Sequence, residues 1–169
     1  MTRARAGDGA QIVVYGEDGV LKAEGEAIGR SRRWRHQLAV APFGSDKEMM
    51  LVDVLTPHIG GRVEFYRWNG DELMIETAVS GYTSHVIGTR NLDMAVAGDW
   101  VGSGGAQLLL PSQDRTMLGV VGIVDGVAEV LLDVPVDGQV VTNLSAVAHN
   151  NGLAVGVGRA DNTLRIWQP

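Results

Sequence analysis

The segment Leu92–Val134, LDMAVAGDWVGSGGAQLLLPSQDRTMLGVVGIVDGVAEVLLDV, contains four short apolar runs separated by turn residues. The runs are Leu92–Ala97, Gln107–Leu110, Thr116–Val124 and Val127–Val134. They are rich in Val, Leu, Ile and Met and lack the 3.6-residue period of a helix. Asp125-Gly126 joins the last two runs, and this dipeptide is a strong hairpin signal because glycine accepts the positive φ of a type I′ turn. The segment therefore predicts a sheet of four short antiparallel strands.

The same unit recurs along the chain, as two independent anchors show. The tripeptide Ala-Val-Ala occurs at intervals of 56 and 51 residues, at Ala39–Ala41, Ala95–Ala97 and Ala146–Ala148. A turn dipeptide recurs at intervals of 51 and 56 residues, at Asp18-Gly19, Asn69-Gly70 and Asp125-Gly126. Both anchors give a period of about 53 residues, and such self-similarity is typical of repeat architectures.

The repeat divides the chain into four units. They are residues 10–27 (strands three and four of a unit), 37–79, 92–134, and 145–169 (strands one to three). Four-stranded units without helices favour an all-β fold of β-propeller blades, about three blades' worth in a single segment. A β-sandwich is the alternative, but it does not require a fixed period.

An incomplete ring leaves strand edges that invite association. Two explanations remain open. The chain is the C-terminal part of a longer propeller, or it forms a homo-oligomer such as a dimer of about six blades. The third strand is present in both partial units, which favours the first explanation.

The composition argues against several classes of function. The net charge of −6 argues against nucleic-acid binding, which relies on a basic surface. The chain has no cysteine, which excludes disulfides, zinc–thiolate sites and thiol nucleophiles. No apolar run approaches the ~20 residues of a membrane span. No signal peptide is visible at the N-terminus. The compartment therefore stays open: cytoplasmic, or extracytoplasmic if the chain belongs to a longer secreted protein.

The segment MAVAGDWVGSGGAQLLLPSQDRTML (94–118) resembles the repeat unit of FG-GAP/VCBS-type proteins, bacterial relatives of the integrin-α propeller. The joining segments IGRSRRW (28–34) and SHVIGTRNLDMAVA (84–97) share this resemblance. LAVGVGRADNTLRIW (153–167) does too, and it also looks like the closing strands of WD-repeat propellers. The resemblance implies a propeller and, in each blade, a calcium-binding loop between the first two strands.

The calcium loop departs from that pattern. Asp99 falls on the first ligand position, but Val101, Ser103 and Gln107 fall on the second, third and last. Calcium needs several oxygen ligands with carboxylates among them. We therefore expect degenerate loops, no cofactor and no metal, with a weak calcium site at Asp99 as the remaining alternative.

In an up-and-down sheet, alternate strand connections emerge at the same end. In a four-stranded blade the 4→1 and 2→3 connections emerge at one end, where basic, histidine and tryptophan residues gather. The candidate ligand-binding residues are Arg33, Trp34, His36, His58, His85 and Arg90. The same end collects Arg30, Arg32, Arg35, Arg115 and Arg159. One-sign clefts concentrate opposite charge, so an anionic glycan, a carboxylate or an acidic protein loop would suit this end. The alternative is that these arginines are solvated or merely brace neighbouring blades.

These patterns favour a non-enzymatic binding or scaffold module that recognises a protein or an anionic carbohydrate. A propeller hydrolase or lyase with a histidine-lined site is one alternative, and a purely structural part of a longer protein is another. Convergence of His36, His58 and His85 within ~5 Å would favour the enzyme or metal alternative. No catalytic motif is present, and Ser84 and His85, if on a strand, would point to opposite sides.

Overall fold

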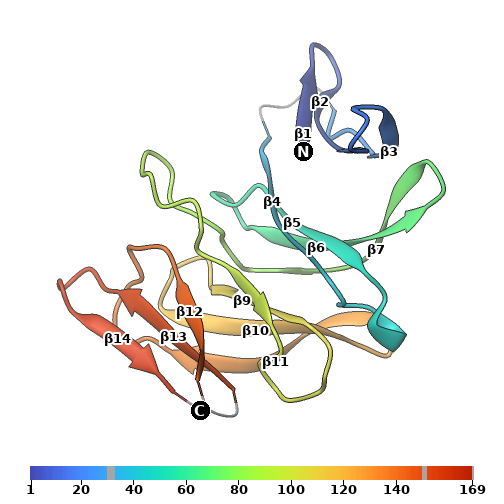
Figure 1. Ribbon diagram of the computed structural model, residues 1–169. Coiled ribbons are helices and arrows are strands. Elements are labelled where there is room, and N and C mark those ends of the chain that lie inside the picture. The colour runs from blue at the N-terminus through green and yellow to red at the C-terminus, as the bar shows by residue number, and fades with distance from the viewer. Residues whose placement is uncertain (30–32, 150–151, 169) are drawn as a thin grey trace.

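A computed structural model describes residues 1–29, 33–149 and 152–168. These described residues form fourteen strands in three sheets, so the predicted all-β, propeller-like fold class is confirmed. Figure 1 shows the sheets following one another along the chain, with the N-terminal strands at one end and the C-terminal strands at the other. Within the described ranges, no helix is long and apolar enough to cross a bilayer.

The first sheet contains a four-stranded antiparallel meander that forms one side of the sheet. Its strands are β4 (Arg35–Ala41), β5 (Met50–Leu55), β6 (Arg62–Asn69) and β7 (Glu72–Ser80). Three further strands extend it: β1 (Thr2–Arg5), β2 (Gly9–Tyr15) and β3 (Leu21–Gly25). The pairing order is β1-β2-β3-β7-β6-β5-β4.

The other two sheets repeat the meander. The second contains β8 (Val96–Gly98), β9 (Gln107–Pro111), β10 (Met117–Val124) and β11 (Val127–Pro135). The third contains β12 (Ser145–His149), β13 (Gly152–Gly158) and β14 (Leu164–Trp167). All strand pairs within these sheets are antiparallel.

The sheets pack face to face through apolar side chains at alternate strand positions. One buried cluster joins the first and second sheets and includes Val52, Val54, Val63, Phe65, Leu108, Leu110 and Val121. Another joins the second and third and includes Leu109, Leu118, Val120, Val155 and Val157. Neighbouring leucines of β9 thus point into different clusters. This two-sided burial is why β9 reads as a continuous apolar run.

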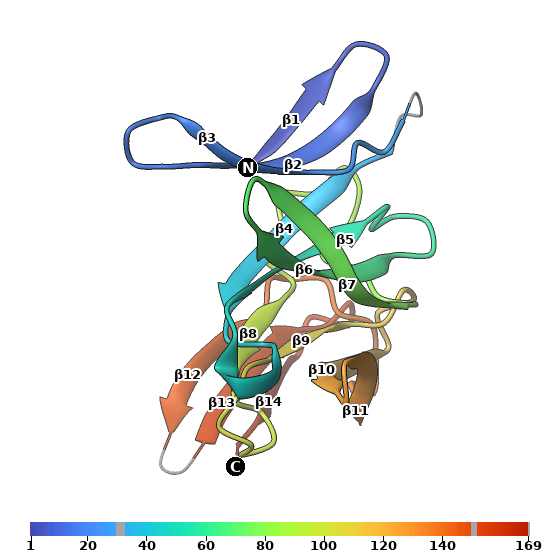
Figure 2. The same ribbon diagram turned by 90° about the vertical axis from the view of Figure 1, so that its right-hand side faces the viewer.

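The N-terminal strands differ from the predicted pair of strands in two respects. An additional strand, β1, pairs with β2. β3 joins the outer edge of β7 in parallel, through Glu24 opposite Glu72 and Gly25 opposite Leu73. The seven-stranded sheet therefore curls, bringing β1 and β2 towards β4 at its other edge. The Gln37 amide donates a hydrogen bond to the Thr2 hydroxyl across this gap. Figure 2 shows β1–β3 lying across the end of the meander.

The Asp125-Gly126 turn has the geometry that the sequence predicts. Asp125 has φ 49° and Gly126 has φ 82°, as a type I′ turn requires at both central positions. At the two equivalent turns only the glycine is left-handed, with φ 67° at Gly70 and 72° at Gly19. The turn glycine is thus the shared backbone feature of the repeat.

Candidate functional site: a histidine cluster and a basic groove

Three histidines from separate segments meet at the end where the 4→1 and 2→3 connections emerge. His36 lies on β4, His58 lies in the β5–β6 loop, and His85 lies in the connection from β7 to β8. The ring centroids of His58 and His85 are 4.4 Å apart, and those of His36 and His85 are 5.0 Å apart. These three residues, termed the histidine cluster, therefore meet the ~5 Å convergence condition stated above.

Trp34 covers the histidine cluster from the segment that precedes β4. Its ring centroid is 5.6 Å from that of His85 and 6.0 Å from that of His58. The indole is more than half exposed, at 55%. One side of Trp34 thus contacts imidazoles, and much of the remaining ring is accessible from solvent.

Ser84 connects two members of the cluster. Its hydroxyl oxygen is 2.8 Å from His36 Nδ1 and 3.2 Å from His85 Nδ1. The expectation that Ser84 and His85 point to opposite sides is wrong, because this connection is not a strand. One hydroxyl proton serves one imidazole acceptor, so the other imidazole donates its Nδ1–H to the oxygen. Ser84 is fully buried, and its bonds fix the orientation of two rings.

The cluster is neutral near pH 7. Burial, together with the neighbouring His58 and His36, lowers the pKa of His85 to about 4. Burial also lowers the pKa of His36, against an opposing effect of Asp93, and it lowers the pKa of His58. The Nε2 atom of His58 is buried and has no hydrogen-bond partner in the described part of the chain. Among the described residues, no group of three histidine, aspartate or glutamate side chains is arranged to hold a metal ion.

A groove of about 520 Å³ runs beside the cluster, between the N-terminal strands and β4. We call it the basic groove; its lining residues are Thr2, Ala10, Arg33, Trp34, Arg35, His36 and Gln37. Arg33 is exposed. None of the lining residues is acidic, although the chain as a whole carries a net charge of −6. The groove unites Arg33, Trp34 and His36 of the candidate binding residues.

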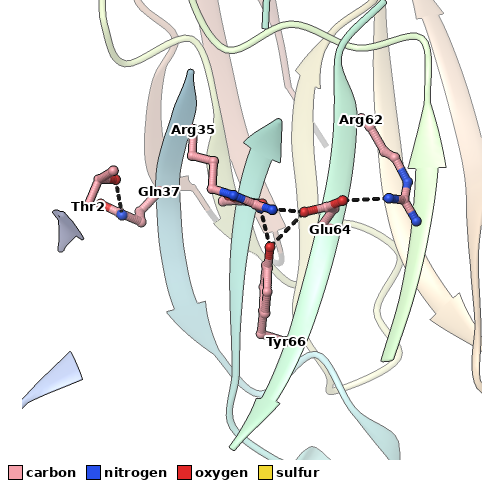
Figure 3. Close-up of polar contacts among 7 residues, drawn as sticks. Thr2, Arg35, Gln37, Arg62, Glu64 and Tyr66 are labelled. Carbon is pink, nitrogen blue, oxygen red and sulfur yellow. Dashed lines mark hydrogen bonds and ion pairs between the residues drawn. The ribbon is translucent and has the colours of Figure 1, made fainter. Parts of the chain in front are cut away.

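Arg35 departs from its expected place among the solvent-facing arginines. It is 6% exposed, and its guanidinium donates to Asp53 at 3.0 Å, to Glu64 at 2.5 Å, and to the Tyr66 hydroxyl. Arg62 reaches the second Glu64 oxygen at 2.6 Å. Figure 3 shows the Arg35, Glu64, Tyr66 and Arg62 side chains of this buried ion network converging. Two carboxylates compensate Arg35, whereas Arg33 forms no ion pair with any residue that the structure describes.

The remaining basic residues lie apart from the groove. Arg90 is exposed in the connection from β7 to β8, and it does not line the basic groove. Arg115 donates to the Val140 carbonyl oxygen, and Arg159 donates to the Val136 and Asp137 carbonyl oxygens. These two arginines brace neighbouring segments, as the alternative interpretation expected. Arg30 and Arg32 lie outside the described residues.

The Asp99 loop is closed by its own backbone. The Asp99 carboxylate accepts hydrogen bonds from the Ser103 and Gly104 N–H groups, at 2.9 and 2.8 Å. The Gln107 side chain, at the last ligand position, accepts from the Trp100 N–H and donates to the Ser103 hydroxyl. The Asp99 carboxylate and the Gln107 side-chain oxygen, which would be the ligands of an ion, accept hydrogen bonds from the backbone of this turn instead.

A second groove, of about 570 Å³, lies where β3 meets β7. Its lining includes Glu24, Glu26, Asp71 and Glu72, of which Glu24 is paired with Arg3 at 2.5 Å. Its negative potential disfavours anions. The two grooves of this half of the molecule therefore have opposite electrostatic character.

The sequence interpretation missed the acidic members of the buried ion network. Asp53 and Glu64 are fully buried and directly opposite each other on β5 and β6. The available signal was a single carboxylate inside each of two apolar runs, MLVDVL and RVEFYRW. Only the strand register shows that these carboxylates meet and that Arg35 reaches both.

Comparisons with known proteins give no match: no family model, no curated protein and no solved structure is significantly similar to this chain.

Proposed function

We propose that the chain is a non-enzymatic propeller module of the FG-GAP/VCBS type that binds an anionic carbohydrate in the basic groove. The observation that carries the proposal is that one groove contains both Arg33, which has no ion pair within the described part of the chain, and the half-exposed indole of Trp34. Both belong to a groove without an acidic residue. The sheet architecture and the segment 94–118 support the family part of the proposal.

The chemistry of the groove matches that ligand class. A guanidinium binds a carboxylate through charge-assisted, often bidentate hydrogen bonds. An aromatic face provides a rigid apolar surface against which the C–H face of a sugar ring packs. The groove, at about 520 Å³, lies within the usual size of small-molecule sites. An acidic protein loop offers the carboxylate but lacks the C–H face of a sugar ring, which suits the exposed indole.

Calorimetry with a carboxylated oligosaccharide tests the proposal. An oligogalacturonide should bind, and a neutral galacto-oligosaccharide of equal length should not. Arg33→Ala should weaken binding about tenfold or more, since hydrogen bonds to charged groups are worth about 1.5–3 kcal/mol. Trp34→Ala should weaken it comparably, and Arg90→Ala should have little effect.

Lys47→Ala is the matched control, because it removes one exposed positive charge from the β4–β5 loop, outside the basic groove. Equal affinity for the neutral and charged oligosaccharides would refute anion recognition. An equal loss in the Lys47 and Arg33 variants would show general electrostatic attraction instead of a site.

The convergence of the three histidines favours a second candidate, a hydrolase or lyase. His36 Nδ1 lies 2.8 Å from the Ser84 hydroxyl, a distance suited to proton transfer. The burial of Ser84 opposes it, because a substrate carbon has no access to the hydroxyl without opening of the connection. Mass spectrometry of the oligosaccharide recovered after incubation separates the candidates. Binding by calorimetry with intact ligand supports a binding module, and shortened or unsaturated products support the enzyme. Neither binding nor products supports a purely structural role.

A further inference from the structure

His36 belongs to both parts of the candidate site. It is a member of the histidine cluster, and it also lines the basic groove. Its Nδ1 atom lies 2.8 Å from the Ser84 hydroxyl oxygen, whereas its Nε2 atom makes no hydrogen bond to any residue that the structure describes. One nitrogen of this imidazole is therefore held by the protein, and the other remains for a ligand in the groove.

The charged or titratable side chains around His36 come from three segments. They are Arg33 and Arg35 just before it in the chain, His58 in the β5–β6 loop, and His85 and Asp93 in the connection from β7 to β8. Burial lowers the pKa of His36, against the opposing effect of Asp93, and Arg33 disfavours a second positive charge in the groove. The charge of Arg35 is balanced by the two carboxylates of the ion network. The strands β1 and β2 contribute no charged residue to the groove lining. His36 is therefore neutral near pH 7 in the free protein.

A ligand carboxylate in the groove changes this balance. The groove lining contains no acidic residue, so the ligand brings the first negative charge into it. An opposite charge within ~4–6 Å favours the charged form of a titratable group. The protonated imidazole can donate from Nε2 to the carboxylate, and such charge-assisted hydrogen bonds are stronger than neutral ones. Binding of the anion and protonation of His36 therefore favour each other.

The contacts of Ser84 favour the addition of a single proton. With His36 protonated, its Nδ1–H donates to the Ser84 oxygen, and the Ser84 hydroxyl donates to His85 Nδ1. Each of these atoms then has a partner. A second proton, on His85, would deprive the fully buried Ser84 hydroxyl of its acceptor and would place two positive rings with centroids 5.0 Å apart.

We propose that an anionic ligand enters the basic groove together with one proton, which His36 takes up, so that mild acidity strengthens binding. This inference rests on the proposed function, because it concerns the regulation of the same groove. The bound protein holds more protons than the free protein at pH values between the free and the bound pKa of His36. The affinity therefore rises as the pH falls through that range, by at most about tenfold per pH unit for one linked proton.

Calorimetry of the full chain with the oligogalacturonide measures the proton directly. Titrations between about pH 8 and pH 5.5, each in two buffers of different ionisation enthalpy, should show proton uptake on binding and an affinity that rises as the pH falls. The carboxylates of the ligand stay ionised over this range, because free carboxyl groups have pKa values near 4 or below. Circular dichroism at each pH checks that the chain stays folded.

A pair of variants assigns the proton to its residue. His36→Gln cannot take up a proton, so it should lose both the proton uptake and the rise in affinity, and at pH 5.5 it should bind about tenfold or more weakly than the parent chain. His149→Gln is the matched control, because His149 lies on β12 in the third sheet, outside the basic groove. It should keep the pH dependence of the parent chain.

NMR titration of the His36 ring supplies an independent readout. The ring should titrate at a higher pH with saturating oligogalacturonide than without it. This measurement also separates His36 from Asp53 of the ion network, which titrates close to the same range because burial raises its pKa to about 7.

Three results would overturn this proposal and leave the carbohydrate site intact. The first is binding at every pH without proton uptake. The second is a pH dependence that His36→Gln retains, and the third is a His36 titration that the ligand leaves unchanged. Absence of oligogalacturonide binding at every pH would instead overturn the proposed function, and this inference with it.

Discussion

The two faces of the first meander show how different the contacts on alternate residues of the same strands can be. One face presents Val52, Val54, Val63 and Phe65, which pack against the second sheet. The other face presents Arg35, Asp53, Glu64 and Tyr66, all of them buried. The first face is closed mainly by apolar contacts, whereas the second carries an ion network inside the curled sheet.

This difference follows from what each face meets. The apolar face contacts a neighbour built from the same repeat, and shape-matched apolar surfaces are sufficient for that contact. The charged face lies inside the curl that β1–β3 complete, next to a small core of Ile12, Ala23, Tyr66 and Leu73. Burial, opposed by Arg35 and reinforced by Glu64, raises the pKa of Asp53 to about 7. The charged form of Asp53 is therefore destabilised by burial, and the apolar face has no such cost.

The largest expected effect comes from removing the cation of the network. Arg35→Met leaves Asp53 and Glu64 buried without their shared partner and should lower the free energy of unfolding by about 3–5 kcal/mol, as measured by urea denaturation at pH 7. Arg62→Met is the control, since Arg62 is about half exposed and contacts only one Glu64 oxygen. Its loss should stay near 1 kcal/mol or below. Equal losses of unfolding free energy in the two variants would show that burying the ion network does not make it more important for stability than an exposed ion pair.

A smaller effect is expected from the histidine cluster. Its contribution to the unfolding free energy depends on pH with the opposite sign to that of the ion network. The unfolded histidine has a pKa near 6.5, whereas burial lowers the pKa of folded His85 to about 4. Between these values the unfolded chain binds more protons. The contribution of His85 is therefore complete above pH 6.5 and is lost as the pH falls towards 4. We expect a loss of about 2–3 kcal/mol over this range from His85 alone.

Asp53 has the opposite sign. Its folded pKa is raised from 3.8 to about 7, so the folded state binds more protons between these values. Its contribution is complete below pH 3.8 and is lost as the pH rises through 7. The unfolding free energy of His85→Gln should therefore rise relative to that of the parent chain as the pH falls from 7 to 5. Asp53→Asn should show the reverse. Urea titrations at several pH values measure both, and parallel curves for the parent and His85→Gln would contradict the assignment.

Much of the fold was accessible from sequence because the repeat and the turn glycines report directly on backbone geometry. Asp125-Gly126 predicted a hairpin that the structure confirms, and each predicted strand pair followed from local pattern. The curl of the first sheet was not accessible. It depends on the two-residue parallel pairing of β3 with β7, which no local signal encodes. Likewise β8 is limited to Val96–Gly98, because the Met94 N–H donates to the Ser84 carbonyl oxygen instead of to a strand neighbour.

The candidate site was accessible only in part, for a related reason. Strand parity placed Trp34, His36, His58 and His85 at one end, where the structure brings them together. The order of the strands predicts at which end of a sheet a connection lies, but it does not predict to which face a side chain points. It could not show that Arg35 points into the curl while His36, one residue later, points towards the second sheet.

The smallest expected effect is the strongest test of the comparison between the two faces. Replacing the network as a unit, by Arg35→Met, Asp53→Val, Glu64→Leu and Tyr66→Phe together, gives the charged face the apolar character of the other face. Buried ion networks exchanged for apolar residues of similar volume are often neutral or stabilising. We therefore expect a free energy of unfolding within about 1 kcal/mol of the parent chain, although Arg35→Met alone loses several times more. A loss near that of Arg35→Met would show that β1–β3 require the charges themselves. Retained stability with faster exchange of the β1–β3 amides would show that the network selects the packing partner of this face and contributes little to its overall stability.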